Sequence, residues 1–290
     1  MKEDSLRGIA DVRLQAKSGK TTWDIVDVGR QYCMSAEAAE LFEPLDYSLI
    51  PNAKDLPAGL QGKNWLGGPV YYSMVLGWNK TKYKDNPPQS FRDFFDTTKF
   101  PGTRALYGQS RFMLEVALLG DGVAPDKIYP IDVDRALKKI ADFKRNVTAF
   151  YTSHGQAVQM VKDKEVDIIA ILDGRADAAI KDGADLAITY NGGIIDAGCF
   201  GIVKGAPNKQ AAMRVLNEFI SADFQANIPN TFFYGPINPK AYATGKISPA
   251  LAASLNSSPD NLKKQMVLGS EWWAENEAKV QPRWDATIVK

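Results

Sequence analysis

The sequence holds few of the residues on which metal centres and nucleophilic catalysis depend. Its 290 residues include one histidine, His154, and two cysteines, Cys33 and Cys199. A lone histidine without cysteine or acidic neighbours at metal-ligand spacing does not make a zinc site. Also missing are a Gly-x-Ser-x-Gly elbow, a Gly-x-x-x-x-Gly-Lys phosphate loop and a Cys-x-x-Cys pair. The sequence therefore predicts no catalytic residue, no metal and no cofactor.

Neither charge nor apolar runs point to nucleic acid or a membrane. The 35 basic and 34 acidic residues nearly cancel, so we expect no electrostatic attraction to nucleic acid or an anionic membrane surface. No apolar run reaches the roughly 18 residues that a membrane-spanning helix needs. The opening Met1-Lys2-Glu3-Asp4-Ser5 lacks the apolar stretch of a signal peptide.

Strand and helix patterns alternate along the chain. Short apolar runs predict strands at 23–29, 69–78, 103–107, 166–171 and 187–190, and a further strand that follows a Gly192-Gly193 turn and ends at Val203. Helical spacing predicts helices at 36–41, 90–96, 112–119, 132–144, 156–162, 176–182 and 210–221, and another from Ser221. This alternation predicts an α/β fold with parallel strands.

Six segments carry a family resemblance, and they keep one order along nearly the whole chain. They are Leu41-Phe42-Glu43-Pro44-Leu45-Asp46, Lys99-Phe100-Pro101-Gly102-Thr103-Arg104-Ala105-Leu106, Lys204-Gly205-Ala206-Pro207-Asn208-Lys209, Tyr234-Gly235-Pro236-Ile237-Asn238-Pro239-Lys240, Asn261-Leu262-Lys263-Lys264-Gln265 and Glu271-Trp272-Trp273. With these segments the chain resembles periplasmic solute-binding proteins of the spermidine/putrescine type, which are components of ABC transporters.

The resemblance implies a two-lobed α/β fold of the type II periplasmic-binding-protein class, with a ligand cleft between the lobes. Hinge closure requires that the chain cross between lobes, and we place crossings near Pro101-Gly102 and Lys204-Gly205. Lobe 1 would then comprise residues 1–101 and 204–290, and lobe 2 residues 102–203. Periplasmic localisation is likewise implied by the resemblance alone.

The two cysteines are a weak indicator of compartment. An exported protein could pair them, but Cys33 falls in the predicted first lobe and Cys199 near the second crossing. We therefore expect two free, mostly buried thiols, which behave as small hydrophobic side chains.

Arg175 is a candidate ligand contact. It follows a predicted strand directly, in Leu172-Asp173-Gly174-Arg175-Ala176. Glycine permits close backbone approach, the helix start offers free N–H groups, and the planar guanidinium suits a carboxylate. The alternative is a surface arginine paired with Asp177 or Asp182.

Two other strand ends carry polar residues. Ser110 and Arg111 follow the strand at 103–107, and Arg30 follows the strand at 23–29. Ser110 would hydrogen-bond to a ligand, and Arg111 would hold a carboxylate or cap its loop. Arg30 would be the contact from the first lobe, or else a solvated surface arginine.

Asp196 marks a departure from the polyamine-binding pattern. Those relatives place an aromatic residue and an acid in the strand that matches Ile194–Cys199. Here Asp196 stands where the aromatic residue is expected and Gly198 where the acid is expected. An acid for an ammonium group remains, but the stacking ring is lost. The alternative role for Asp196 is a salt bridge to a neighbouring arginine.

Aromatic residues complete the candidate site. The resemblance places Tyr234 and Trp273 at the border of the cleft, where rings bind alkyl chains and cations. One of Trp272 and Trp273 is expected to be a core residue instead. We expect His154 to be a solvated loop histidine rather than a ligand contact.

These residues predict a solute-binding component of an ABC importer that captures a small amine-bearing solute by domain closure and delivers it to the transporter's membrane subunits. Arg111 and Arg175 would repel a polyamine, so a zwitterionic amino acid such as an ω-amino acid is favoured over spermidine or putrescine. One rival is an enzyme on the same scaffold, with Cys199 or His154 as nucleophile or base. Another is the sensing module of a regulator, although no basic patch or DNA-binding segment accompanies it.

The resemblance also predicts a late start. Relatives begin with a strand, a Gly-rich loop and a helix ahead of the segment that matches Met1–Gly8. Ala10, Val12, Leu14 and Ala16 then fall in the helix after the second strand. Because a missing central strand leaves backbone groups unpaired, we expect either self-association that fills the gap or a rearranged first lobe with weak binding.

Overall fold

The computed structural model describes residues 9–289. The segment Met1–Gly8, to which the prediction of a late start refers, lies outside the described residues. The chain divides into two compact units. Unit 1 comprises Met1–Tyr71 and Ala197–Ser257, and unit 2 comprises Tyr72–Asp196 and Ser258–Lys290.

Two long strands carry the chain from one unit to the other. β2 (Leu66–Asn79) and β6 (Leu186–Ile202) each contain a unit boundary, and a third boundary follows Ser257. The units thus differ from the predicted lobes, because residues 72–101 and 258–290 belong to unit 2 and residues 197–203 to unit 1. The prediction used Pro-Gly and Lys-Gly loops as crossings, since domain boundaries usually fall in such linkers. Here two of the three boundaries fall inside paired strands.

The loop at Pro101-Gly102 is tied into unit 2 by a buried arginine. Arg104 is 1% exposed, and its guanidinium donates to the carbonyl oxygens of Phe94 at 2.7 Å and Gly102 at 2.6 Å. It also donates to the carbonyl oxygen of Phe100. Since a buried cation is tolerated only when its donors are satisfied, this loop is held in place and does not behave as a linker.

Unit 1 combines two segments that lie far apart in the sequence. Its elements are α1 (Ile9–Lys17), β1 (Ile25–Gly29), α2 (Arg30–Cys33), α3 (Ala38–Leu41), η1 (Tyr47–Leu49), η2 (Pro51–Asp55), η3 (Ala58–Leu60), α9 (Lys209–Phe219), α10 (Ala222–Thr231), η6 (Pro239–Ala243) and α11 (Pro249–Ser254). β1 pairs antiparallel with the end of β6, with Asp27 opposite Phe200 and Gly29 opposite Gly198. The predicted helix start at Ser221 is confirmed, since its side chain accepts a hydrogen bond from the Phe224 N–H.

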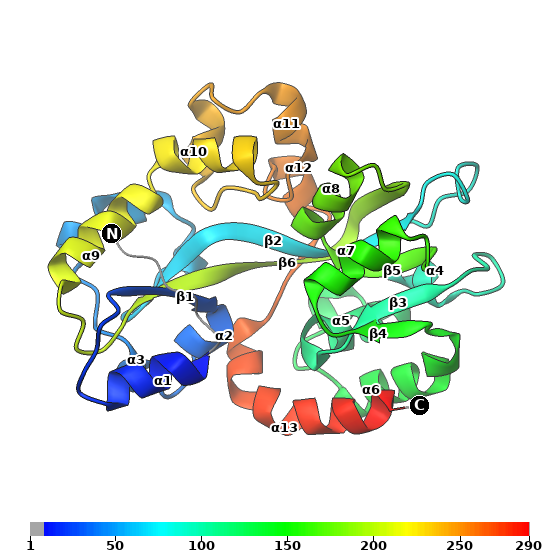
Figure 1. The fold of residues 1–290 in the computed structure, drawn as a ribbon, viewed down its shortest axis with the longest axis horizontal. Helices are drawn as coiled ribbons and strands as arrows, with labels where there is room; N and C mark the ends of the chain where they lie inside the picture. Colours follow the sequence, from blue (N-terminus) through cyan, green and yellow to red (C-terminus); the bar gives the residue numbers. More distant parts are fainter. Residues whose placement is uncertain (1–8, 290) are drawn as a thin grey trace. The chain divides into compact units, whose positions relative to one another are not determined.

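Unit 2 holds the parallel strands. Its elements are β3 (Arg104–Tyr107), β4 (Ala149–Tyr151), β5 (Ile168–Leu172), β7 (Met266–Val267), α4 (Phe91–Phe95), α5 (Ser110–Gly120), η4 (Pro125–Lys127), α6 (Val133–Phe143), η5 (Lys144–Asn146), α7 (His154–Lys162), α8 (Asp173–Lys181), α12 (Pro259–Leu262) and α13 (Ser270–Ile288). β3 pairs in parallel with β4 and with β5, whereas β2 runs antiparallel to β5. Figure 1 shows α7 and α8 side by side, next to β5.

The sheet is mixed rather than purely parallel. The hydrogen-bonded order of the strands is β1-β6-β2-β5-β3-β4, and β7 pairs with β6. The predicted turn at Gly192-Gly193 is wrong, because β6 runs through it as one strand of 17 residues. Gly192 adopts φ +68° and its N–H donates to the Lys264 carbonyl at 2.9 Å. Glycine here permits a kink within a strand and does not end it.

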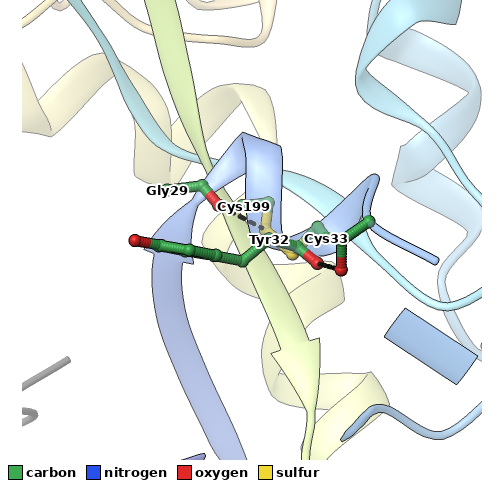
Figure 2. Close-up of a disulfide and its surroundings, with 5 residues drawn as sticks. Gly29, Tyr32, Cys33 and Cys199 are labelled. Atoms are coloured by element: carbon green, nitrogen blue, oxygen red, sulfur yellow. Dashed lines mark hydrogen bonds between the residues drawn. A yellow bond between two sulfur atoms is a disulfide. The ribbon is translucent and has the colours of Figure 1, made fainter. Parts of the chain in front are cut away.

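A disulfide joins Cys33 to Cys199, so the prediction of two free thiols is wrong. Cys33 ends α2 directly after β1, and Cys199 lies on β6 opposite Val28 of β1. Strand pairing thus brings two residues that are 166 positions apart in sequence to a Cα–Cα distance of 6.6 Å (Figure 2). Both cysteines belong to unit 1.

Among residues 9–289, no helix combines the length and the apolar character that crossing a membrane would require.

Candidate functional site

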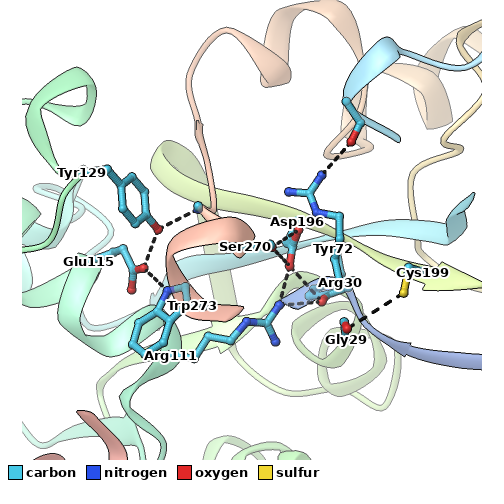
Figure 3. Close-up of polar contacts among 12 residues, drawn as sticks. Gly29, Arg30, Tyr72, Arg111, Glu115, Tyr129, Asp196, Cys199, Ser270 and Trp273 are labelled. Atoms are coloured by element: carbon cyan, nitrogen blue, oxygen red, sulfur yellow. Dashed lines mark hydrogen bonds and ion pairs between the residues drawn. The ribbon is translucent and has the colours of Figure 1, made fainter. Parts of the chain in front are cut away.

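A buried ion pair in unit 2 joins Arg111 to Asp196 (Figure 3). The Asp196 carboxylate is 1% exposed and the Arg111 side chain 15%. Asp196 also accepts hydrogen bonds from the Ser270 hydroxyl at 3.3 Å and from the Tyr72 hydroxyl at 3.4 Å. The pair therefore has the additional hydrogen bonds that a desolvated carboxylate requires.

Arg111 remains a cation in this setting. Its guanidinium donates to the Tyr72 hydroxyl oxygen at 3.1 Å as well as to Asp196. Burial lowers the pKa of Arg111, but Tyr72 and Asp196 raise it, and the net direction is upward. The salt bridge that the sequence offered as the alternative role of Asp196 is thus present.

An irregular turn holds Arg111 in place. β3 ends at Tyr107, and the backbone at the start of α5 is non-helical, with ψ 133° at Arg111 and φ +71° at Phe112. A bulky residue in the left-handed region costs about 1–3 kcal/mol and typically occurs at functional sites. The Phe112 ring lies 5.0 Å from the Arg111 guanidinium carbon and packs edge-on against Tyr72. The strained turn therefore places the arginine and its aromatic support together.

A second network fixes the segment that carries Ser270. Glu115 is fully buried, and one of its oxygens accepts from the Tyr129 hydroxyl and the Trp273 indole N–H, both at 2.6 Å. The Tyr129 oxygen in turn accepts from the Gly269 N–H at 2.8 Å. Burial raises the pKa of Glu115, and the hydrogen bonds from Tyr129 and Trp273 act in the opposite direction. This network anchors the start of α13, next to Asp196.

Ser110 and Trp273 are enclosed by unit 2 as the structure stands. The Ser110 hydroxyl donates to the Gln281 side-chain oxygen at 2.7 Å. Trp273 has no exposed surface, whereas Trp272 is partly exposed and packs edge-on against it. Of the two tryptophans, Trp273 is therefore the core residue.

Arg175 lies exposed on α8. Asp177 and Asp182, its proposed surface partners, pair instead with Lys181 at 2.8 Å and Lys162 at 2.9 Å. Within residues 9–289 Arg175 makes no hydrogen bond or ion pair, so its guanidinium is available to an anion.

His154 differs from the expected solvated loop residue. It begins α7 and is half-buried, with its ring 5.0 Å from that of Tyr107 and 6.3 Å from that of Tyr151. Burial, and secondly the positive charge of Arg175, lower the pKa of His154. An aromatic cluster therefore lines the ends of β3 and β4.

In unit 1, Arg30 begins α2 and is 7% exposed, so it is not a solvated surface arginine. Its guanidinium donates to the Gly59 carbonyl at 3.4 Å. Tyr234 is partly buried in the turn after α10. These placements leave ligand contact by either residue as a prediction.

Asp27 is a polar residue of unit 1 that sequence reasoning missed. It lies on β1 between Val26 and Val28, which point to the other face of the strand and are buried. The Asp27 side chain is exposed, yet desolvation by the surrounding protein raises the pKa of its carboxyl to about 7. The sequence signal that could have identified it is the position of an acidic residue between valines in a predicted strand.

No group of three or more His, Cys, Asp or Glu side chains within the described part of the chain is arranged to hold a metal ion.

Comparisons with known proteins define the class and then the family. A protein from Bradyrhizobium japonicum USDA 110, solved as an ABC transporter substrate-binding protein, superposes with a TM-score of 0.94 at 40% identity, covering 99% of this chain and 89% of its own. The periplasmic binding protein MotA from A. tumefaciens B6, in complex with glucopine, gives a TM-score of 0.88 at 36% identity, over 99% and 90%. Residues 4–253 match the family described as bacterial extracellular solute-binding protein, and the chain belongs to that family.

Two relatives carry ligand names. The gamma-aminobutyric acid-binding protein of Pseudomonas aeruginosa PAO1 is 29% identical over 97% of this chain and 80% of its own length. The spermidine/putrescine-binding periplasmic protein of Escherichia coli K12 is 22% identical over 86% and 72%. The predicted family and α/β binding-protein fold are confirmed. Proteins of this class bind small solutes and engage the membrane components of ABC transporters, and this chain is such a substrate-binding protein.

Proposed function

We propose that the protein is the periplasmic component of an ABC importer that captures a small zwitterionic amino acid, such as an ω-amino acid. The observation that carries the proposal is the Arg111–Asp196 pair, which presents both signs of charge beside two hydroxyl groups. The name of the Pseudomonas relative supports it. A polyamine is the alternative, supported by the name of the more distant Escherichia relative.

Zwitterionic amino acids and polyamines differ in what their binding would do to the Arg111–Asp196 ion pair. A diamine that binds Asp196 would leave Arg111, which is 15% exposed, without its counter-ion. Breaking a buried pair by removing one partner costs about 3–5 kcal/mol. A zwitterion avoids this cost, because its ammonium group can bind Asp196 while its carboxylate binds Arg111. The pair therefore favours a ligand that carries both charges.

Arg175 adds to this preference. Its guanidinium is exposed and makes no hydrogen bond or ion pair within the described residues. It would attract a ligand carboxylate through two parallel hydrogen bonds and would repel a second ammonium group.

The disulfide supports an oxidising compartment, because such bonds are rare in bacterial cytosol. It also removes Cys199 as a thiolate nucleophile, which argues against the rival enzyme. The protein would then deliver its solute unchanged. Thiol labelling of the exported protein before and after reduction tests the compartment, and free thiols in the native protein would contradict it.

Isothermal titration calorimetry with γ-aminobutyrate, putrescine and spermidine tests the ligand class. We expect γ-aminobutyrate to bind more tightly than either polyamine. Arg175→Ala should weaken its binding by about 2–5 kcal/mol. Arg145, another exposed arginine of unit 2, provides the matched control Arg145→Ala, which should bind like the parent protein. Tight binding of spermidine without binding of γ-aminobutyrate would refute the assignment.

A further inference from the structure

We propose that Asp27 forms, with the Gly68 carbonyl and the Gln31 side chain, a subsite in unit 1 for a primary ammonium group. The inference rests on the proposed function in taking the solute to be an amine. A ligand with a single ammonium group binds it at Asp27 or at Asp196 but not at both, and the Asp27→Asn variant distinguishes the two placements.

The subsite is built on a pair of glycines. Gly29 of β1 lies opposite Gly198 of β6, and Asp27 lies opposite Phe200 one pair further along. Opposite residues of antiparallel strands, and every second residue along a strand, project from the same face. The face beside Asp27 therefore lacks side chains from the glycine pair, so that other polar atoms can approach the two strands closely.

Oxygen atoms make this close approach. A Cβ atom added to Gly198 would lie 2.7 Å from an Asp27 carboxylate oxygen and 2.5 Å from the Gly68 carbonyl oxygen. A Cβ atom added to Gly29 would lie 2.5 Å from the Gln31 side-chain oxygen. These oxygens thus gather around two neighbouring glycines, and an ammonium group has three N–H donors to offer such a set.

Asp27 has no cation of its own. Within the described residues its carboxylate makes no hydrogen bond or ion pair, although the charged form is disfavoured by desolvation. An ammonium ligand would supply the missing opposite charge. Asp196 differs in this respect, because its carboxylate already forms an ion pair with Arg111.

Proton linkage follows from this geometry. Across from Asp27, the facing residues of β6 do not titrate, since Cys199 is in the disulfide, and Gly68 of β2 has no side chain. Because the pKa of Asp27 is about 7, the carboxylate is mostly protonated at pH 6 and mostly ionised at pH 8. Primary ammonium and carboxylate groups of a ligand keep their charges over this range.

The test is calorimetric titration of the full chain with γ-aminobutyrate and with putrescine at pH 6, 7 and 8. We expect affinity for the bound amine to rise roughly tenfold from pH 6 to pH 8. Asp27→Asn should lower the affinity at pH 8 by at least about tenfold and abolish the pH dependence. Glu40→Gln, at an exposed acid of the same unit, is the matched control and should retain both.

A second variant isolates the source of the pH dependence. His154 is the only histidine of the chain, and His154→Gln should retain the dependence if Asp27 causes it. An unchanged affinity in a folded Asp27→Asn protein would overturn the subsite while leaving the proposed function intact. Binding of putrescine alone, weakened by Asp27→Asn, would overturn the amino-acid assignment while supporting the subsite. Failure of both amines to bind the parent protein would overturn both.

Discussion

Asp27 of unit 1 and Asp196 of unit 2 both lie on strands, but their carboxylates have opposite surroundings. Asp196 is 1% exposed and bonded to an arginine and two hydroxyl groups. Asp27 is exposed and has no ion-pair or hydrogen-bond partner in residues 9–289, and its pKa is raised to about 7. The buried carboxylate of Asp196 is tolerated because Arg111 of the same unit pairs with it. An acid that keeps contact with water can be left for a ligand to neutralise.

The comparison also separates two ways of attracting an amine. At Asp196 a ligand must replace Arg111, so the arginine needs a new anion from the same ligand. At Asp27 an ammonium group gains a counter-ion without displacing one. The first arrangement selects for zwitterions, and the second supplies affinity for ammonium groups in general.

The largest effect is expected when the paired acid loses its partner. Arg111→Met should reduce the free energy of unfolding by about 3–5 kcal/mol, because Asp196 would be left buried without a counter-ion. Urea denaturation measures this change. The double variant Arg111→Met/Asp196→Leu should recover most of it, since apolar replacement of a whole buried pair is often neutral. A loss below about 1 kcal/mol in the single variant would contradict the importance of the pair.

A smaller effect is expected when the space beside Asp27 is filled. Gly198→Ala would bring a methyl group to 2.5 Å from the Gly68 carbonyl oxygen, so the backbone must shift. Such overpacking costs about 1–3 kcal/mol. Gly59→Ala is the matched control in unit 1, because nothing lies within 4 Å of its added methyl group. Equal melting temperatures for the two variants would show that the glycine pair is not closely confined.

The smallest effect concerns stability against pH. The unfolded chain ionises Asp27 near the ordinary pKa of 3.8, whereas the folded protein holds the proton up to about pH 7. Stability from this group is therefore complete below about pH 4 and is lost as pH rises through 7. Asp27→Asn should remove that decline and be more stable than the parent at pH 8 by about 1–2 kcal/mol, a value reduced for solvent screening. Denaturation curves at pH 5 and pH 8 test this, and a variant that is no more stable at pH 8 would contradict the raised pKa.

Local features of the fold were predictable from sequence because their causes are local. The Asp132 side chain accepts from the Arg135 N–H and starts α6 as its position predicts. The amphipathic pattern from Gln210 gives α9, with Leu216 buried. Val12 is buried in the predicted first helix, α1, although Leu14 of the same helix is 69% exposed.

Features that depend on distant pairing were not predictable. The disulfide and the position of Asp27 both follow from the pairing of β1 with β6, which joins residues about 170 positions apart. The same limit applies to Arg111, whose partner Asp196 comes from a strand far along the chain. The sequence predicts the residue types of the candidate site. It does not predict that Asp27 fills the space beside Gly198, where polyamine-binding relatives are expected to carry an acid.

The pairing of β1 with β6 has a consequence for the order in which the protein is made. Gly29 leaves the ribosome long before Ile202, and at 5–20 residues per second the interval is roughly 10–35 s. Throughout that time β1 lacks the strand to which it is hydrogen-bonded in the finished protein. Most of unit 2, residues 72–196, is synthesised within the same interval. Its strands β3, β4 and β5 pair over shorter separations in sequence, so they can pair earlier. Unit 1 therefore stays open at β1 until β6 has been synthesised, and Cys33 remains a thiol until Cys199 has been translated.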